Sequence, residues 1–140
     1  INNLLRERQQ VLVSMCELAE LESGDVPPDT VIHNLRGFNQ QLVDYTALGH
    51  FEIYERIIDG KERRGNIKVV ADRVYPSISD TTQVFVEFND KYDGVDEPES
   101  LGDLYSDLSS IGEAMADRIE SEDMLLREIS DSLESPSKNL

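Results

Sequence analysis

The chain has 140 residues, which is enough for one domain with a hydrophobic core of its own. Its 29 acidic and 13 basic residues give a net charge of −16, which argues against nucleic acid or anionic membranes as partners and favours basic proteins. No signal peptide and no apolar run long enough to cross a membrane is visible, so we expect a cytoplasmic protein.

Apolar residues recur at helical spacing along almost the whole chain. The first stripe consists of Leu4, Leu5, Leu12, Met15, Leu18 and Ala19. We expect the single cysteine, Cys16, to be buried on this helix as a small hydrophobe, because one thiol cannot form an internal disulfide. After a rigid turn around Pro27 and Pro28, Asp29 or Thr30 can cap a second helix.

The inward stripe of this second helix is formed by Ile32, Leu35, Phe38, Leu42 and Tyr45. Gly49 has two interpretations: it lies on the stripe where a neighbouring helix crosses closely, or it ends the helix as a C-terminal cap. Pro76 lies inside a third stripe, and it should kink that helix or divide it into two pieces. The third stripe contains Val70, Val74, Ile78, Phe85, Phe88 and Tyr92.

The last helix has the clearest stripe, made of Leu101, Leu104, Tyr105, Leu108, Ile111, Met115, Ile119, Leu126, Ile129 and Leu133. No strand-like alternation competes with these patterns. The sequence therefore predicts an all-α fold, a single antiparallel four-helix bundle over residues 1–134, followed by a flexible tail over residues 135–140. Because the sequence starts with Ile1 rather than methionine, we expect further residues to precede it in the full protein.

Motifs for catalysis or metal binding are missing. A di-iron site in a four-helix bundle needs Glu-x-x-His on two helices, and neither His33 nor His50 has a glutamate three residues before it. His50 is followed by Phe51 and Glu52, which matches a phosphotransfer histidine poorly. No glycine-rich phosphate loop or nucleophile elbow occurs. We therefore predict a binding protein that is not an enzyme, with no metal and no other cofactor.

The outward face of the second helix combines apolar and acidic side chains. When residues 35–55 are wound as one helix, the face opposite the inward stripe includes Gln41, Asp44, Leu48, Phe51 and Glu55. Apolar side chains flanked by acids are typical of a partner site that selects a basic protein. Two alternatives stay open: another segment covers Leu48 and Phe51, or a kink at Gly49 turns Phe51 inward.

A second group of polar residues points towards the bundle interior. Glu122 falls on the apolar phase of the last helix and is followed by Asp123. Because a buried acid requires hydrogen-bond partners, we expect a structural cluster that joins these acids to residues after Gly49. Its predicted members are His50, Tyr54, Arg56, Glu122 and Asp123.

Two stretches carry charged and glycine positions in a specific order: QLVDYTALGHFEIYERI at residues 41–57 and LSSIGEAMADRIESEDMLL at residues 108–126. These stretches resemble the Rsd/AlgQ family, bacterial anti-sigma regulators of the primary sigma factor. A weaker likeness, which includes the proline-interrupted third helix, covers nearly the whole chain. The tryptophan that the family usually carries in its N-terminal helix is absent here.

The resemblance implies a transcription regulator that sequesters the primary sigma factor, mainly through the C-terminal sigma domain that reads the −35 promoter element. Keeping sigma from core RNA polymerase would favour alternative sigma factors in stationary phase. The outward face of the second helix, with Asp44 as its most important residue, is the expected partner-binding site. We also expect a monomer when unbound, with no direct contact to nucleic acid or membrane.

Two other functions fit parts of the sequence. The mildly basic stretch from Arg56 to Arg73 could bind an acidic cytoplasmic protein, such as a metabolic or stress-signalling enzyme. The last helix lies in a region, Asp96 to Glu134, with 13 acids and two bases, and its carboxylates could belong to a metal-dependent enzyme. A pull-down from cytoplasm tests the first alternative, and metal analysis of the purified protein tests the second.

Overall fold

The computed structural model describes residues 2–50 and 65–134. Within these ranges no strand occurs, and the predicted all-α bundle is confirmed. The helices are α1 (Asn2–Glu20), α2 (Pro28–Gly49), α4 (Gly65–Tyr92) and α5 (Leu104–Glu134), with short 3-10 turns η1 (Leu21–Ser23) and η3 (Pro98–Leu101) in the connections. The predicted tail, residues 135–140, lies outside the described residues.

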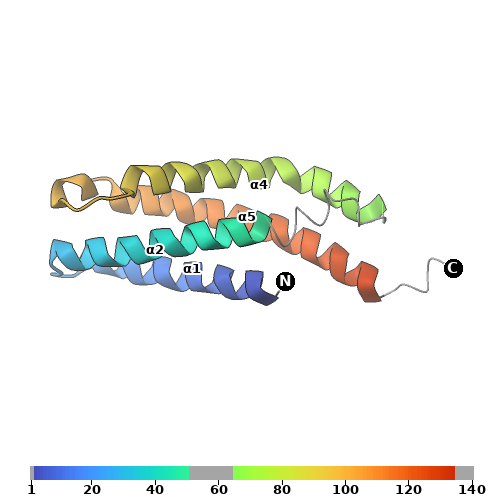
Figure 1. Cartoon of the computed structure of the whole chain (residues 1–140), viewed down its shortest axis with the longest axis horizontal. Coiled ribbons are helices and arrows are strands. Elements are labelled where there is room, and N and C mark those ends of the chain that lie inside the picture. Colours follow the sequence, from blue (N-terminus) through green and yellow to red (C-terminus); the bar gives the residue numbers. More distant parts are fainter. Residues whose placement is uncertain (1, 51–64, 135–140) are drawn as a thin grey trace.

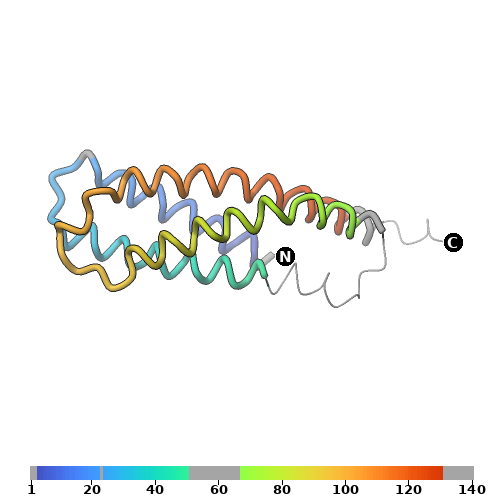
Figure 2. The backbone as a smooth tube through the Cα atoms, turned by 90° about the horizontal axis from the view of Figure 1, so that it is seen from above, coloured from blue at the N-terminus to red at the C-terminus, as the bar shows by residue number. Residues whose placement is uncertain are grey.

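The four helices form two antiparallel hairpins that lie side by side (Figure 1). Helix α1 packs most closely against α2, and α4 packs most closely against α5. The turns of both hairpins lie at the same end of the molecule, so each helix is antiparallel to its two neighbours around the bundle (Figure 1, Figure 2). Contacts between the hairpins, from α2 to α4 and from α1 to α5, are looser than the contacts within them.

The core follows a seven-residue repeat, because steps of three and four keep one stripe of each helix facing the bundle axis. In α5 the buried stripe contains Leu104, Leu108, Ile111, Met115, Arg118, Glu122, Leu125 and Ile129. The predicted stripe members Ile119 and Leu126 are partly buried against the core, whereas their neighbours Arg118 and Leu125 occupy its fully buried centre. Arg118 is missed when only apolar residues are considered as candidates for the core.

Cys16 is exposed, so the prediction that it is buried is wrong. The buried residues of α1 are Leu4, Val11 and Leu18, at intervals of seven residues. Cys16 precedes Leu18 by two residues, which places it about 200° around the helix from the buried stripe. Its side chain therefore faces away from the bundle axis.

Pro76 lies inside α4, which continues through it as one helix. The proline ring cannot donate the hydrogen bond that the carbonyl of Asp72 would otherwise accept. Val74 and Ile78 are buried on either side and hold this part of α4 against the core. In Figure 1 the green, N-terminal part of α4 slopes away from the rest of the helix, so the structure shows a bend rather than a division.

Gly49 combines parts of its two interpretations. It is the last residue of α2 and is buried, and a Cβ atom added there would lie 3.5 Å from both Leu4 Cδ1 and Arg118 Nη2. It is not a left-handed cap, because Gly94 is the only residue with positive φ in the described part of the chain. Gly49 thus lies on the inward stripe, close to its neighbours, at the point where the helix ends.

Buried charges join all four described helices close to the C-terminal end of α2. Arg118 and Glu122 are each only 1% exposed, and Arg118 Nε donates to Glu122 Oε2 at 3.3 Å. The other carboxylate oxygen, Glu122 Oε1, accepts hydrogen bonds from the Tyr45 hydroxyl at 2.5 Å and from Arg8 Nη1 at 3.5 Å. Burial and the adjacent Glu122 carboxylate raise the pKa of Tyr45, which keeps its hydroxyl a donor. We call these residues, with the α4 groups that contact Arg118, the Arg118–Glu122 network.

Helix α4 supplies the remaining partners of the guanidinium. Arg118 Nη1 donates to three oxygens of α4: Thr82 Oγ1 at 2.8 Å, Thr81 Oγ1 at 3.2 Å and the Ile78 carbonyl at 3.4 Å. The guanidinium carbon also lies 5.4 Å from the ring centroids of Tyr45 and Phe85. The buried cation is therefore met by an acid, by three neutral oxygens and by two aromatic faces.

A smaller polar contact fastens the turn end of the α4–α5 hairpin. Lys91 Nζ and the Tyr92 hydroxyl each donate to Asp107 Oδ2 at 2.7 Å. The hydrogen bonds from Lys91 and Tyr92 hold the pKa of the Asp107 carboxyl below its ordinary value. Asp107 therefore stabilises the fold in its charged form.

We predict that Asp107→Asn destabilises the protein at neutral pH but has little effect in acid. A carboxyl with a depressed folded-state pKa contributes stability above its unfolded pKa and loses that contribution as pH falls through the folded value. Urea unfolding should show a stability difference from the parent at about pH 7 that shrinks between roughly pH 5 and pH 2. The control is Asp90→Asn, an exposed acid on α4. A parent-to-variant difference that stays constant down to low pH would contradict the prediction.

We predict that Glu122→Gln lowers the free energy of unfolding by about 3–5 kcal/mol, because it leaves Arg118 buried without a counter-charge. Chemical denaturation measures this loss. The matched control is Asp117→Asn, an exposed acid on the same helix, which should change stability by less than about 0.5 kcal/mol.

Combining Arg118→Met with Glu122→Gln should recover part of the loss, because no buried charge then remains without a partner. The free energies of the parent, both single variants and the double variant form a double-mutant cycle. Single-variant losses that simply add in the double variant would show that the two residues are not coupled.

Candidate functional site

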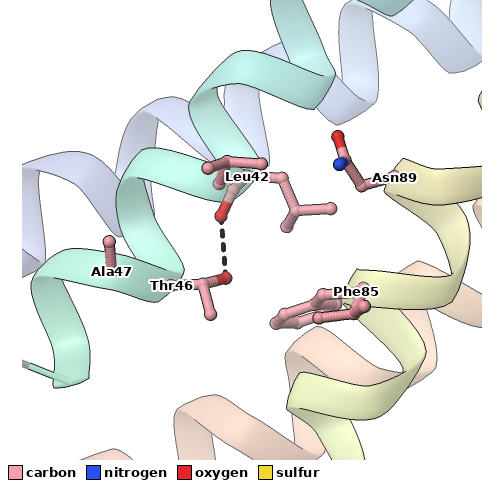
Figure 3. A pocket seen from close by; sticks show the side chains of 7 residues that line it. Leu42, Thr46, Ala47, Phe85 and Asn89 are labelled. Carbon is pink, nitrogen blue, oxygen red and sulfur yellow. Dashed lines mark hydrogen bonds between the residues drawn. The ribbon is translucent and has the colours of Figure 1, made fainter. Parts of the chain in front are cut away.

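An apolar groove of about 320 Å³ runs between α2 and α4. It is lined by Leu42, Val43, Thr46, Ala47, Phe85, Val86 and Asn89. In Figure 3 the labelled side chains of α2 and those of α4 lie on the two sides of this groove. Leu42 and Phe85 also belong to the buried core, whereas Val43 is 43% exposed and Val86 is 46% exposed. The groove therefore has a buried apolar floor and accessible apolar walls.

Helical spacing brings the lining residues of α2 together. Leu42 and Thr46 are four residues apart, as are Val43 and Ala47, so both pairs lie on the side of α2 that faces α4. The Thr46 hydroxyl donates to the Leu42 carbonyl at 2.8 Å, as the dashed line in Figure 3 shows. Because this polar atom is satisfied within its own helix, Thr46 can line the groove without requiring a partner there.

Asp44 is exposed and directly follows the groove residue Val43. Its Oδ1 accepts a hydrogen bond from Gln40 Nε2 at 2.9 Å. In the ranges that the structure describes, Asp44 forms no ion pair. A carboxylate bound only by a neighbouring surface amide keeps acceptor capacity for a basic or hydrogen-bond-donating group of another protein.

The other predicted partner-binding residues are placed differently from Asp44. Gln41 is half-buried, and its Oε1 accepts a hydrogen bond from the Ser14 hydroxyl of α1 at 2.5 Å. Leu48, two turns further along the same side of α2, is also half-buried. Phe51 and Glu55 lie outside the described residues.

The exposed face of α2 is therefore rotated towards α4 relative to the predicted face. A helical wheel of α2 predicts that the face opposite the core is exposed, but α1 contacts part of that face through Ser14 and Gln41. Val43 and Ala47 are exposed instead, and together with Asp44 they form the accessible surface next to the groove. Val86, on the opposite wall, was not in the predicted site, because no feature of the sequence pairs that part of α4 with α2.

Three residues of the predicted polar cluster, His50, Glu122 and Asp123, belong to the described part of the chain. Glu122 is buried on the inward side of α5, and Asp123 accepts a hydrogen bond from Arg8 Nη1 at 2.9 Å. His50 is exposed at the end of α2, and Tyr54 and Arg56 lie outside the described residues.

Sequence reasoning missed Arg8 and Arg118, the basic partners of Glu122 in the described structure. A signal for Arg118 was present in the sequence. Steps of four, three and four from Ile111 lead through Met115 to Arg118 and Glu122, so both charged residues continue the inward stripe.

The described ranges contain neither a group of side chains that could bind a metal ion nor a helix that could span a membrane. No group of three or more His, Cys, Asp or Glu side chains there could hold a metal ion. None of the helices found in those ranges combines the length and the apolar character that a membrane span requires. What the described surface offers is an apolar groove beside an exposed acid, which suits an apolar side chain and a basic group of a protein partner.

Comparison with known proteins gives a consistent result. The family model described as "Regulator of RNA polymerase sigma(70) subunit, Rsd/AlgQ" matches residues 1–130. A protein named Regulator of sigma D from Yersinia enterocolitica is 34% identical over 131 residues, which cover 91% of this chain and 78% of that protein. Proteins of the same name from Yersinia pseudotuberculosis and Enterobacter sp. strain 638 are 31% and 33% identical over 130 residues, which cover 91% and 90% of this chain and 77% of each relative. No solved structure gives a significant match.

Proposed function

The chain belongs to the Rsd/AlgQ family of regulators of the RNA polymerase sigma(70) subunit, and we propose on this premise that it is an anti-sigma factor that binds the primary sigma factor. In this proposal it holds sigma away from core RNA polymerase and so favours alternative sigma factors in stationary phase. The main contact is the C-terminal sigma domain that reads the −35 element. The protein acts in the cytoplasm by binding rather than catalysis, as a monomer before sigma binds, and contacts neither nucleic acid nor membrane.

The observation that supports this function is the apolar groove between α2 and α4 beside the exposed Asp44. A helix of sigma can place an apolar side chain between Val43 and Val86 while a basic or donor group meets Asp44. A domain that reads DNA is basic, because it must bind phosphates. The net charge of −16 therefore complements the proposed partner and speeds their encounter.

The proposed surface extends beyond the groove on the α1 side of Asp44. Gln41 and Leu48 are half-buried there, and their remaining exposed atoms continue the surface of α2. Phe51 and Glu55 belong to the proposal on the sequence pattern alone. Within this surface the apolar groove would bind an apolar side chain of the partner. Asp44 would select a partner that has a basic or hydrogen-bond-donating group at that point.

We predict that Asp44→Ala weakens binding to the isolated C-terminal sigma domain by about 2–5 kcal/mol, because it removes one partner of a partly desolvated polar pair. Isothermal titration calorimetry measures the loss. The free energy of unfolding should change by less than about 0.5 kcal/mol, because Asp44 is exposed and its hydrogen bond in the described structure is to the surface residue Gln40.

The matched control is Glu120→Ala, which removes an exposed acid of α5 and so tests for a general loss of negative charge. It should bind the sigma domain as tightly as the parent protein does. If Asp44→Ala also binds like the parent, the binding surface lies elsewhere on the molecule.

We predict that affinity for sigma falls as salt rises from about 50 mM to about 500 mM, because dissolved ions screen exposed charge pairs. Each exposed pair contributes only about 0.2–1 kcal/mol, so apolar contacts in the groove should preserve part of the binding at high salt. Titrations at three salt concentrations test this. An affinity that does not change with salt would remove the electrostatic part of the proposal.

A further inference from the structure

A second groove, of about 570 Å³, lies between α1 and α5. Around the bundle the helices follow the order α1, α2, α4 and α5, so this groove is on the opposite side of the molecule from the α2–α4 groove (Figure 1, Figure 2). Its apolar or small lining residues include Met15, Cys16, Ala19, Leu108, Gly112 and Ala116. It lies along the second contact between the hairpins, from α1 to α5, where the helices pack less closely than within each hairpin.

The shape of this α1–α5 groove suits a helix. Small side chains keep it open, and a Cβ atom added at Gly112 would come no closer than 3.9 Å to Met15 Sδ. The α5 residues that line it run from Tyr105 to Ala116, which is about 16 Å along the axis, or three helical turns. Leu108 is buried at the floor, so an apolar side chain of a bound helix would meet apolar atoms.

The rim of the α1–α5 groove is acidic. Glu22 of η1 and Glu113 of α5 line it and are exposed. Among the residues described, neither of them forms an ion pair. Burial and the charge of Glu22 raise the pKa of Tyr105, which indicates that Glu22 and Tyr105 lie close together across one end of the groove.

The two chain segments that form this groove contain no lysine or arginine of their own next to the lining residues. No lysine or arginine occurs between Arg8 and Arg36, or between Lys91 and Arg118. Arg8 binds Glu122 and Asp123, and Arg118 is buried with Glu122, so neither arginine neutralises the acids of the groove. Within residues 2–50 and 65–134, no basic side chain forms an ion pair with the acids of the α1–α5 groove.

We propose that the α1–α5 groove is a second docking surface that binds a basic amphipathic helix of a partner protein. The apolar face of that helix would lie on Leu108, Gly112 and Ala116, and its lysine or arginine side chains would meet Glu22 and Glu113. A second copy of this chain is a poor occupant, because its net charge of −16 would be repelled. The proposal does not depend on sigma binding at Asp44, and both surfaces can be occupied at once.

The test uses the whole protein and a fluorescent peptide of about 18 residues, made of leucine and lysine with leucines at helical i, i+3, i+4 spacing. A second peptide has the same composition in an order without helical periodicity. Fluorescence anisotropy measures both affinities. We expect the periodic peptide to bind at least about tenfold more tightly than the other, because only the periodic peptide presents an apolar face and a basic face together.

Two variants locate the bound peptide. Glu113→Arg reverses a rim charge, and Ala116→Trp places a bulky side chain in the groove, from an exposed lining position, without changing the charge. Each should weaken binding of the periodic peptide by about tenfold or more, since one removes attraction and the other removes space. Circular dichroism and urea unfolding check that both variants fold like the parent.

Two further variants serve as controls. Asp80→Arg makes the same charge change as Glu113→Arg on the exposed surface of α4, and Asp44→Ala alters the proposed sigma surface. Both should bind the periodic peptide within about twofold of the parent, because neither touches the α1–α5 groove. Loss of sigma binding without loss of peptide binding in Asp44→Ala would separate the two surfaces.

Four outcomes would overturn the proposal. The periodic peptide does not bind, or the non-periodic peptide binds equally well. Asp80→Arg weakens binding as much as Glu113→Arg does, which would mean that the peptide responds only to total charge. Sedimentation shows a dimer that Glu113→Arg dissociates, which would assign the groove to a second copy of the chain.

Discussion

The ion pair between Arg118 and Glu122 is the constraint to which the rest of the bundle must conform. Both side chains occupy positions of the inward stripe of α5 and are almost fully buried. An unpaired charge in that position would be very costly, so the other helices must bring their polar groups to this level. Arg8, Tyr45 and the Thr81–Thr82 pair do so from α1, α2 and α4. We interpret the network as the feature that sets the register of the four helices, since sliding any one of them would separate donors from acceptors.

The register of the helices in turn determines the surface. Tight packing within each hairpin and looser packing between the hairpins accompany the α2–α4 groove and the α1–α5 groove, which lie on opposite sides of the described bundle. Val43 and Val86 of the α2–α4 groove lie a few residues along their helices from the network members Tyr45 and Thr82. Charges are divided in the same way: the interior acid Glu122 has partners on three helices, whereas Asp44, Glu22 and Glu113 form no ion pair in the described structure. In the described structure Glu122 is thus paired inside the bundle, whereas these three exposed acids carry negative charge without an ion-pair partner.

Parts of the candidate site could be predicted from local sequence, and other parts could not. The helical phase set by Leu35, Phe38 and Leu42 is enough to place Asp44 on the outside of α2, and the structure has it exposed. The same wheel also places Gln41 and Leu48 outside, but both are half-buried, and Gln41 contacts Ser14 of α1. A wheel describes one helix by itself, so it cannot show which arc a neighbouring helix will cover.

The sequence by itself determined the helices, their number in the described ranges and the inward stripe of α2, because periodic burial is a local property of a chain. It also contained the phase that buries Arg118 and exposes Cys16, in the intervals of three, four and seven residues that separate core positions. Only the tertiary structure decided that Arg8 and Tyr45 would meet Glu122, and that grooves would lie between α2 and α4 and between α1 and α5. Those contacts join residues from distant parts of the chain, and they depend on how tightly whole helices pack, which no local pattern specifies.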